Sequence, residues 1–343
     1  MLLLTCVKGL EDIVTAEIKQ KLSDFEIVRQ EKGFLLLNYN GHPRRLLDLR
    51  SVEDIFYVIF DQDGFEKSRS TLTAIKELVQ KNSFDDALSY HAQIYSKPKH
   101  TNFQVFAHLY GRWNFRRADL EQTVSKAIDQ KFRRWKPVRG KAKLEFDIRL
   151  FKTGQTYLSL RLTDKYFSNR KYKQADIPGS LKPTVAYALV ELSKPNEGDI
   201  FLDPFCGAGT ILAERARVAP ANKIIGSDTS EQARAAAAIN TGDRNNVEIK
   251  DWDALQIPLS ESSVNVIVTN PPFGKKIDKD PVLLPRFLAE ADRLLSPGGR
   301  LILLNSDISC VEANIPKELR SDKSKDIVLL GEPARIWLFT KNK

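Results

Sequence analysis

An asparagine followed by two prolines carries the most specific chemical signal in the sequence. Asn270, Pro271, Pro272 and Phe273 directly follow the apolar run VNVIVT, at the end of an expected strand. An exocyclic amine on a nucleobase is a poor nucleophile, because its lone pair is delocalised into the ring. The Asn270 side-chain oxygen and the Pro271 carbonyl could accept its N–H groups, since proline stiffens this backbone, and Phe273 could stack on an extruded base. The motif favours chemistry on a base amine over the common Asn-Pro turn that merely ends a strand.

Three carboxylates follow three earlier expected strands. Asp203 precedes the glycine turn in CGAGT, Asp228 ends KIIGSD, and Asp253 lies in DWDAL. A turn of small residues at a helix N-terminus is the usual cofactor position in a doubly wound sheet. Asp228 could bind both hydroxyls of a ribose, and Asp253 an amine such as that of adenine. A dinucleotide fingerprint would need a third glycine where Leu212 stands, so a pyrophosphate ligand fits poorly.

The elements that must position these residues alternate between strand and helix from Leu181 onward. This alternation predicts a mostly parallel sheet covered by helices. Residues 1–60 read as a small α+β unit, and a second α+β unit follows, with a helix from about Arg117 to Trp135. The stretch 166–180 is rich in charge and turn formers, so we expect a linker there.

The 343 residues carry a formal charge of +9 and 42% hydrophobic residues, which excludes a disordered tail or a mini-protein. Residues 101–180 hold 18 basic and 7 acidic side chains, whereas the segments on either side are each at −1. This excess predicts a polyanion-binding module. Phe132 and Trp135 lie three apart on the expected helix, so we interpret them as core residues rather than base-stacking ones. The candidate RNA-binding residues are Arg112, Asn114, Arg116, Arg117, Arg133, Arg134, Lys136, Arg170, Lys171 and Lys173.

The cysteines and histidines show no ligand spacing. Cys6, Cys206 and Cys310 are far apart, and the four histidines lack an H-E-x-x-H pattern, so we expect reduced thiols and no metal. The start MLLLTCVKGL is too short to span a membrane and lacks a cationic region ahead of its apolar run. These features predict a cytoplasmic protein without a targeting or membrane segment.

Two known families resemble these segments. Residues 181–343 resemble class I S-adenosylmethionine-dependent methyltransferases that modify amines, with DPFCGAGT, IIGSD, DWDAL and TNPPFG in the family's order. Residues 61–165 resemble a THUMP RNA-binding domain through FQVFAHLYGRWNFRRADLEQTV and TYLSLRL, with a ferredoxin-like unit at 1–60 ahead of it. The pairing resembles the THUMP-containing tRNA guanine-N2 methyltransferases, closest to those that modify the acceptor stem.

The resemblance implies a fold and an activity. The fold would be α/β, with a Rossmann-like, mostly parallel seven-stranded sheet after an α+β THUMP domain with its ferredoxin-like subdomain. The activity would be methylation of the exocyclic N2 amine of a tRNA guanosine, in the acceptor stem at a position of the sixth-nucleotide type. S-adenosyl-L-methionine would be the cofactor, tRNA the partner, docked by the THUMP region, and the protein a monomer.

The resemblance also implies site residues. Catalysis would fall to Asn270, Pro271 and Phe273. Many relatives carry tyrosine after the two prolines, so Phe273 keeps the stacking face but lacks a hydroxyl. No Asp or His stands ready as a dedicated base, and catalysis would be mostly positioning. The implied cofactor-binding residues are Lys182, Pro183, Thr184, Asp203, Phe205, Gly207, Gly209, Thr210, Asp228, Asp253, Ala254 and Asn270.

Three other functions compete with this one. The motif chemistry would also serve an N-methyltransferase acting on adenine or cytosine of rRNA or DNA. A noncatalytic RNA-binding protein could retain the fold, although the intact set Asp203, Asp228, Asp253 and Asn270 argues against it. A sulfur-transfer enzyme with the same RNA-binding domain would need an S-G-G-x-D-S loop, which the sequence lacks.

Overall fold

The structure is a computed structural model of the whole chain, and it describes residues 1–96, 101–164, 166–242, 244–272 and 281–343. The chain divides into two compact units that do not follow chain order. Unit 1 comprises Met1–Thr5, Ile18–Leu49 and Asp54–Lys165; unit 2 comprises Cys6–Glu17, Arg50–Glu53 and Tyr166–Lys343. The stretch 166–180 therefore groups with unit 2. The domain boundaries expected at 60, 165 and 180 stay predictions.

Unit 1 is built on one eight-stranded sheet in the order β2-β3-β1-β4-β8-β7-β5-β6. Its pairs are antiparallel except for β5 with β6 and β5 with β7. The predicted first and second α+β units thus share one sheet, because β4 pairs with β8. The strands are β1 (Leu2–Thr5), β2 (Phe25–Glu31), β3 (Phe34–Tyr39), β4 (Asp54–Gln62), β5 (Asn102–Leu109), β6 (Lys136–Pro137), β7 (Leu144–Leu150) and β8 (Thr156–Arg161).

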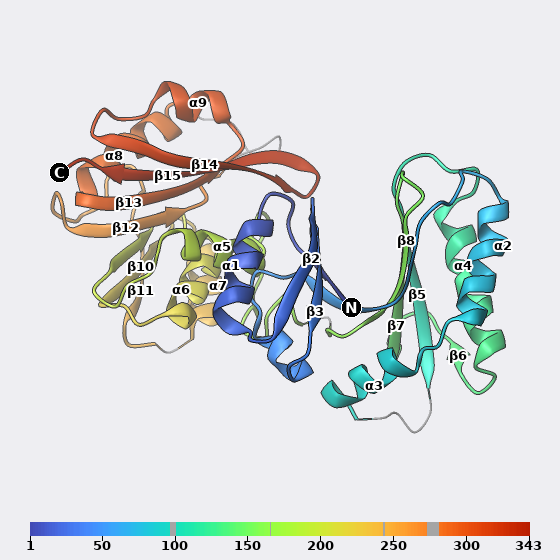
Figure 1. Cartoon of the computed structure of the whole chain (residues 1–343). Helices are drawn as coiled ribbons and strands as arrows, with labels where there is room; N and C mark the ends of the chain where they lie inside the picture. Colours follow the sequence, from blue (N-terminus) through green and yellow to red (C-terminus); the bar gives the residue numbers. More distant parts are fainter. Residues whose placement is uncertain (97–100, 165, 243, 273–280) are drawn as a thin grey trace. The chain divides into compact units, whose positions relative to one another are not determined.

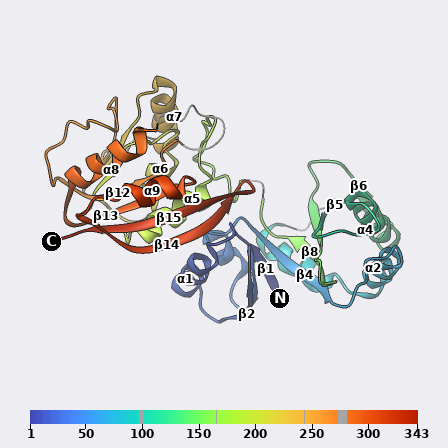
Figure 2. The ribbon, with the colours of Figure 1, turned by 90° about the horizontal axis from the view of Figure 1, so that it is seen from above.

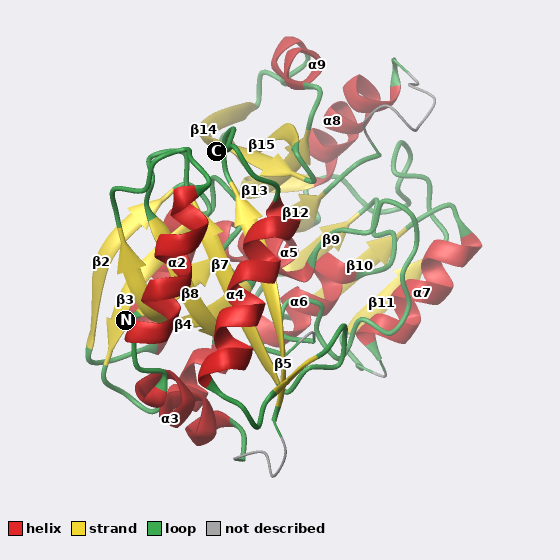
Figure 3. Cartoon of the chain, turned by 90° about the vertical axis from the view of Figure 1, so that its right-hand side faces the viewer, coloured by secondary structure: helices red, strands yellow, loops and turns green. Residues whose placement is uncertain are grey.

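Helices cover one face of this sheet, where α2 and α4 lie across the strands (Figure 3). Alternate residues of β5, such as Phe103 and Val105, are buried against Leu120 and Val124 of α4. Residues two apart on the strand and four apart on the helix lie on one face of each element, so the two apolar faces can pack together. The helices of unit 1 are the 3-10 helix η1 (Pro43–Asp48), α2 (Ser70–Lys81), α3 (Asp85–Ile94) and α4 (Arg117–Lys131), whereas α1 (Glu11–Lys21) is divided between the two units after Glu17. The expected helix from about Arg117 therefore ends at Lys131.

Unit 2 is built on a seven-stranded sheet in the order β11-β10-β9-β12-β13-β15-β14. The first five strands are parallel, whereas β15 runs antiparallel to both of its neighbours. The predicted mostly parallel, Rossmann-like seven-stranded sheet is confirmed. The strands are β9 (Ile200–Asp203), β10 (Lys223–Ser227), β11 (Val247–Lys250), β12 (Val264–Thr269), β13 (Leu295–Asn305), β14 (Leu319–Leu329) and β15 (Glu332–Lys341).

Both faces of the central strands in unit 2 are buried. Phe201 of β9 packs in a cluster with Leu189 of α5 and Leu212 of α6, while the next residue, Leu202, packs with Phe287 of α8 on the other face. Burial on both faces explains why these strands read as continuous apolar runs. Figure 1 shows α8 on one side of the sheet and α5 and α6 on the other. The helices are α5 (Pro183–Leu192), α6 (Thr210–Val218), α7 (Glu231–Thr241), α8 (Leu283–Leu294) and α9 (Ile308–Ala313).

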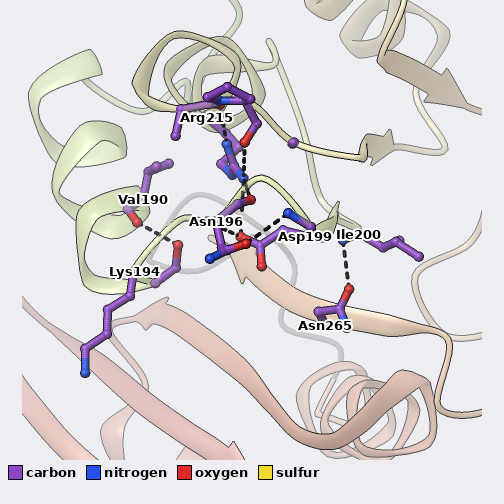
Figure 4. Close-up of polar contacts among 12 residues, drawn as sticks. Val190, Lys194, Asn196, Asp199, Ile200, Arg215 and Asn265 are labelled. Carbon is purple, nitrogen blue, oxygen red and sulfur yellow. Dashed lines mark hydrogen bonds and ion pairs between the residues drawn. The ribbon is translucent and has the colours of Figure 1, made fainter.

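The amino ends of these strands are held together by a polar network around Asp199 (Figure 4). Its buried carboxylate accepts hydrogen bonds from the Asn196 N–H at 2.8 Å, from Arg215 at 3.2 Å and from Arg300 at 2.9 Å. The Asn265 side-chain oxygen accepts from the Ile200 N–H at 2.9 Å. A polar hollow of about 410 Å³ borders this network. Because the polar groups at this edge bind one another, we expect the functional site at the carboxyl edge of the sheet.

Candidate active site

The carboxyl edge of the sheet brings together the residues that close β9 and β12. Asp203 ends β9 and Thr269 ends β12. The Thr269 hydroxyl donates to Asp203 Oδ1 at 2.7 Å, and both side chains are buried. Asn270 and Pro271 follow directly. The spacing in the sequence was enough to place these groups at one edge of a parallel sheet, and the structure joins them through Thr269.

The Asp203 carboxylate is buried and only half satisfied. Its Oδ1 also accepts from the Phe205 N–H at 3.3 Å, whereas its Oδ2 has no hydrogen-bond partner among the described residues. Burial, with a smaller contribution from Asp228, raises the pKa of Asp203 to about 7. An unpartnered buried carboxylate oxygen is costly. It is therefore a place where a cationic ligand group would be stabilised.

The glycine turn between β9 and α6 lies against the second carboxylate. The Gly207 N–H donates to Asp228 Oδ2 at 3.0 Å, and the Ser230 N–H donates to Oδ1 at 2.9 Å. Gly209 has φ +70°, and a Cβ there would lie 2.9 Å from the Cα of Ala237, so the turn requires glycine at this position. A Cβ on Gly207 would meet only the tip of Ile177 at 3.8 Å. The turn thus leaves open space above Gly207 and orients Asp228 beside it.

A strap formed by residues 174–184 is tied to this turn by Asn240 of α7. The Asn240 side-chain oxygen accepts from the N–H groups of Gln174 and Ala175 at 2.8 and 3.0 Å. Its amide nitrogen donates to the carbonyls of Ala175 and Ala208 at 2.7 and 2.8 Å. Asn240 is 1% exposed and uses all four of its hydrogen-bonding positions. It therefore fixes the strap against the residue between the two turn glycines.

Three buried hydroxyls of unit 2 belong to residues at helix starts or strand ends. Thr184, Thr210 and Ser227 each have a buried hydroxyl without a partner among the described residues. Pro183 occupies the first turn of α5, where a missing N–H costs nothing, and it is buried. The Lys182 ammonium instead binds Glu53 at 2.6 Å. We therefore expect Lys182 to contribute through its backbone, not its charge.

The remaining predicted cofactor residues differ in their burial and in their contacts. Ala254 is buried, but Asp253 is exposed and its Oδ1 accepts from the Leu255 N–H at 2.9 Å. Among the described residues, no hydrogen bond joins Asp253 to Asp203 or Asp228. The Phe205 ring packs edge-on against Phe287, with centroids 5.1 Å apart.

The asparagine of the motif has the free acceptor that the chemistry needs. Asn270 Oδ1 is buried and has no partner among the described residues, and Pro271 is buried beside it. Phe273 lies outside the described residues. The sequence interpretation missed Thr269 and Asn240. Thr269 was detectable as a polar residue ending an apolar strand, whereas Asn240 lies 65 positions from Ala175 and gives no local signal.

The predicted RNA-binding residues fall into an exposed and an inward-facing set. In the inward-facing set, Arg170 donates to the carbonyls of Phe167 and Arg50, and Lys173 donates to the carbonyl of Leu181. Their side chains are 10% and 11% exposed, so neither residue belongs to the proposed RNA surface. The residues of the exposed set are Arg112, Asn114, Arg116, Arg117, Arg133, Arg134, Lys136 and Lys171.

The aromatic side chains interleaved with these cations serve the core. Phe132 and Trp135 stack with ring centroids 4.0 Å apart and pack against the cluster under α4. Both side chains are partly buried, which supports their interpretation as core residues.

Among the residues that the structure describes, no helix has the length and apolar character that crossing a membrane requires. Over the same ranges, no group of three or more His, Cys, Asp or Glu side chains is arranged to hold a metal ion.

Sequence comparison finds methyltransferases among the relatives of this chain. A family model described as an RMKL-like methyltransferase domain matches residues 170–329. The tRNA (guanine(6)-N2)-methyltransferase of Thermus thermophilus is 30% identical over 250 residues, which cover 70% of this chain and 72% of that protein. The U6 snRNA (guanine-N(2))-methyltransferase THUMPD2 of Bos taurus is 36% identical over 132 residues, 37% of this chain and 26% of the relative. This chain thus matches about a quarter of the mammalian relative's length.

The fold comparison extends over the whole chain. The crystal structure of TrmN from Thermus thermophilus is similar with a TM-score of 0.80, and the match covers 99% of each chain at 23% sequence identity. At this identity the likeness establishes a shared fold.

Proposed function

Because the chain belongs to the family of tRNA guanine-N2 methyltransferases, we propose that it transfers a methyl group from S-adenosyl-L-methionine to the N2 amine of a tRNA guanosine. The observation that carries this proposal is the pair of unpartnered buried oxygens, Asp203 Oδ2 and Asn270 Oδ1, on adjacent strand ends. One suits a cationic ligand group, and the other suits an N–H donor.

The residues around the glycine turn fit the cofactor. When bound, S-adenosyl-L-methionine supplies an electrophilic methyl group on a positively charged sulfur. Asp203 and the open space above Gly207 would receive its methionine part, and the hydroxyls of Thr184 and Thr210 would find partners there. Asp228 has lone pairs left for the ribose hydroxyls, since the backbone N–H groups take only one from each oxygen. Ala254 and Asp253 would border the adenine.

The motif would align and activate the amine. Asn270 Oδ1 would accept one N–H of the guanine amine and the Pro271 carbonyl the other, which localises the nitrogen lone pair toward the methyl carbon. Asn270 Oδ1 and the Pro271 carbonyl would keep both N–H groups bound while the nitrogen accepts the methyl group, and the surplus proton would then pass from the nitrogen to water. Positioning then supplies most of the catalysis.

The exposed cations of residues 101–180 would hold the RNA. Phosphate contacts give affinity without reading sequence, and duplex RNA is recognised largely by its shape. We propose that unit 1 docks the acceptor end of tRNA and that the target lies in the acceptor stem. A cytoplasmic site of action and a monomeric state stay predictions.

The test is to incubate the purified protein with isotope-labelled S-adenosyl-L-methionine and unmodified tRNA transcripts, then to digest the RNA and identify the labelled nucleoside. We expect N2-methylguanosine. Labelled N6-methyladenosine or N4-methylcytidine would support the alternative base-amine methyltransferase, and absence of transfer would support the noncatalytic RNA-binding protein.

A further inference from the structure

The hairpin formed by β14 and β15 extends past the carboxyl edge of the sheet in unit 2 (Figures 1 and 2). Arg335 of β15 lies opposite Asn305, the last residue of β13. Because β13 is parallel to β12, Asn305 marks the edge at which Asn270 lies. Leu330 at the tip is five positions from Arg335, so at roughly 3.4 Å per residue the tip projects on the order of 17 Å beyond this edge.

The turn at the tip uses a residue that its backbone disfavours. Leu329 pairs with Glu332, which leaves Leu330 and Gly331 as a two-residue turn with φ +50° and +88°. Positive φ at both positions is typical of the hairpin turns that prefer Asn-Gly or Asp-Gly. A leucine is crowded there, because its Cβ approaches the following carbonyl oxygen. The sequence therefore departs from the local rule at Leu330.

Packing within the chain does not compensate for this departure. Leu330 is 92% exposed, the largest exposed fraction among the described large hydrophobic residues, and Val328 nearby is 40% exposed. Residues in sparsely populated backbone regions concentrate at functional sites, and breaks of a local rule without a compensating contact point the same way. The exposed side chain is thus available for a contact outside the chain.

The hairpin is braced along its length, so it presents the tip in a defined place. Lys325 binds Asp12 at 2.7 Å, and Arg335 binds Asp326 across the hairpin at 2.6 Å. The backbone of β14 also donates to the Lys8 carbonyl at 3.1 Å. Because these contacts hold the hairpin in place, its tip can insert a side chain into a partner without the hairpin bending back.

We propose that Leu330 is a wedge that enters the RNA helix beside the target guanosine and fills the space left when that base swings out. This inference rests on the proposed function and adds how its site gains access to a paired base. A base cannot bring its amine to Asn270 while it is stacked. Nucleic-acid-binding proteins insert apolar side chains, leucine among them, between base steps.

The size of the tip favours RNA over a protein partner. A stable protein interface buries roughly 800 Å² on each side, whereas the tip offers one fully exposed leucine and one partly exposed valine. A single apolar side chain of this kind matches the gap between two base pairs. Its place beyond the edge that carries Asn270 puts it on the side from which the substrate must approach.

The central variant is Leu330→Asn. Asparagine tolerates the left-handed conformation, so the folded protein should melt at or above the wild-type temperature while the wedge is lost. Leu330→Met keeps a long apolar side chain and should retain activity. Ile239→Ala is the matched control, because Ile239 is 55% exposed on α7 and lies far along the chain from the hairpin.

Each protein is assayed on two tRNA transcripts that differ only opposite the target guanosine, whose place is mapped first with the wild type. In one transcript the guanosine is paired, and in the other it faces an abasic site. We expect Leu330→Asn to lower kcat/KM by about tenfold or more on the paired transcript, because unstacking then lacks compensation. On the abasic transcript we expect a change of less than about twofold, since little unstacking is left to offset.

Several outcomes would overturn the wedge. Equal losses of kcat/KM on both transcripts would show that Leu330 is a general docking contact. No loss on either transcript would indicate that the tip contacts a protein partner instead. A loss accompanied by a lower melting temperature in Leu330→Asn would make it a folding residue. Absence of methyl transfer by the wild type on either transcript would instead remove the proposed function, and the wedge with it.

Discussion

The charge on Asp203 controls how well the proposed site can hold a cationic ligand. Burial raises its pKa to about 7, and its Oδ2 lacks a partner among the described residues. A positively charged ligand group next to this oxygen favours the ionised carboxylate. Below the pKa, binding must first release a proton. The affinity for a cationic ligand should therefore approach its full value above pH 7 and fall as the pH drops through this value.

This linkage gives a measurable prediction. Between about pH 8 and pH 6, the affinity for S-adenosyl-L-methionine should weaken by roughly tenfold, the loss expected one unit below a pKa of 7. Isothermal titration calorimetry without RNA measures it. Asp203→Asn should bind more weakly and show little pH dependence. An unchanged affinity across this range, or the same slope in Asp203→Asn, would show that another group carries the charge.

Asn270 should matter for turnover and little for cofactor binding. Asn270→Ala removes the acceptor proposed for the guanine amine, so we expect kcat to fall by about a hundredfold or more, as when a positioned hydrogen-bonding group is deleted. Single-turnover methyl transfer and calorimetry measure the two effects separately.

The matched control for this variant is Asn265→Ala. Asn265 also bonds to its surroundings through a side-chain oxygen, but it lies at the opposite edge of the sheet (Figure 4). It should keep kcat within about twofold, since no transition-state contact is removed. A large loss of cofactor affinity in Asn270→Ala, with kcat preserved, would contradict the role assigned to Asn270.

The strap over the glycine turn is the element that completes the proposed cofactor pocket. Asn240 satisfies backbone groups of the strap and of the turn at once. Asn240→Ala would leave these buried groups unpaired, at about 1–3 kcal/mol. We expect the affinity for S-adenosyl-L-methionine to fall by roughly tenfold, with a smaller effect on kcat at saturation.

A second asparagine tests whether this effect is specific. Asn246 donates one hydrogen bond, of 3.3 Å, to the Ala221 carbonyl elsewhere in unit 2. Asn246→Ala should lower the melting temperature slightly and leave cofactor affinity unchanged. If Asn240→Ala only lowered the melting temperature as well, the strap would be structural alone.

The strands around the site were predictable and some of the elements that brace them were not. Asp203 ends the apolar run that became β9, and Asp228 and Asn270 directly follow the runs that became β10 and β12, so pattern and chemistry agreed there. In contrast, β4 went unpredicted although its apolar run DIFYVIF is a local strand signal. Its pairing with β8, about a hundred residues away, is what no local pattern reveals. The helix α3 went unpredicted because only Ala87, His91 and Ile94 mark its buried face. Long-range pairing and sparse patterning leave little trace in local sequence.

At the scale of the whole molecule, charge and chemistry lie on different parts of the chain. The net charge of +11 on residues 101–180 contrasts with −1 on residues 181–343. The exposed cations lie mostly in unit 1, whereas the proposed catalytic groups lie in unit 2. This separation suits an enzyme that grips a polyanion with one unit and admits a neutral base with the other.

Charge reversal tests the proposed grip. Changing Arg133, Arg134 and Lys136 to glutamate should weaken tRNA binding and flatten the dependence of log Kd on log salt by about two to three units of slope, since each lost phosphate contact removes close to one. Filter binding over a salt series measures this slope.

A matched reversal in unit 2 serves as the control. Lys317, Lys323 and Lys343 are exposed there, and changing them to glutamate alters the net charge equally. This control should leave the slope nearly unchanged. If both triple variants behaved alike, net charge rather than the surface of unit 1 would govern binding, and the proposed RNA surface would have to move.

The central claim is that Asn270 directs methyl transfer to the N2 amine of a tRNA guanosine. The most direct measurement is mass spectrometry of the nucleosides from unmodified tRNA after reaction with isotope-labelled S-adenosyl-L-methionine, with wild type and Asn270→Ala run in parallel. The account predicts labelled N2-methylguanosine with the wild type and almost none with Asn270→Ala. Label in a different nucleoside, or equal N2-methylguanosine from both proteins, would contradict it.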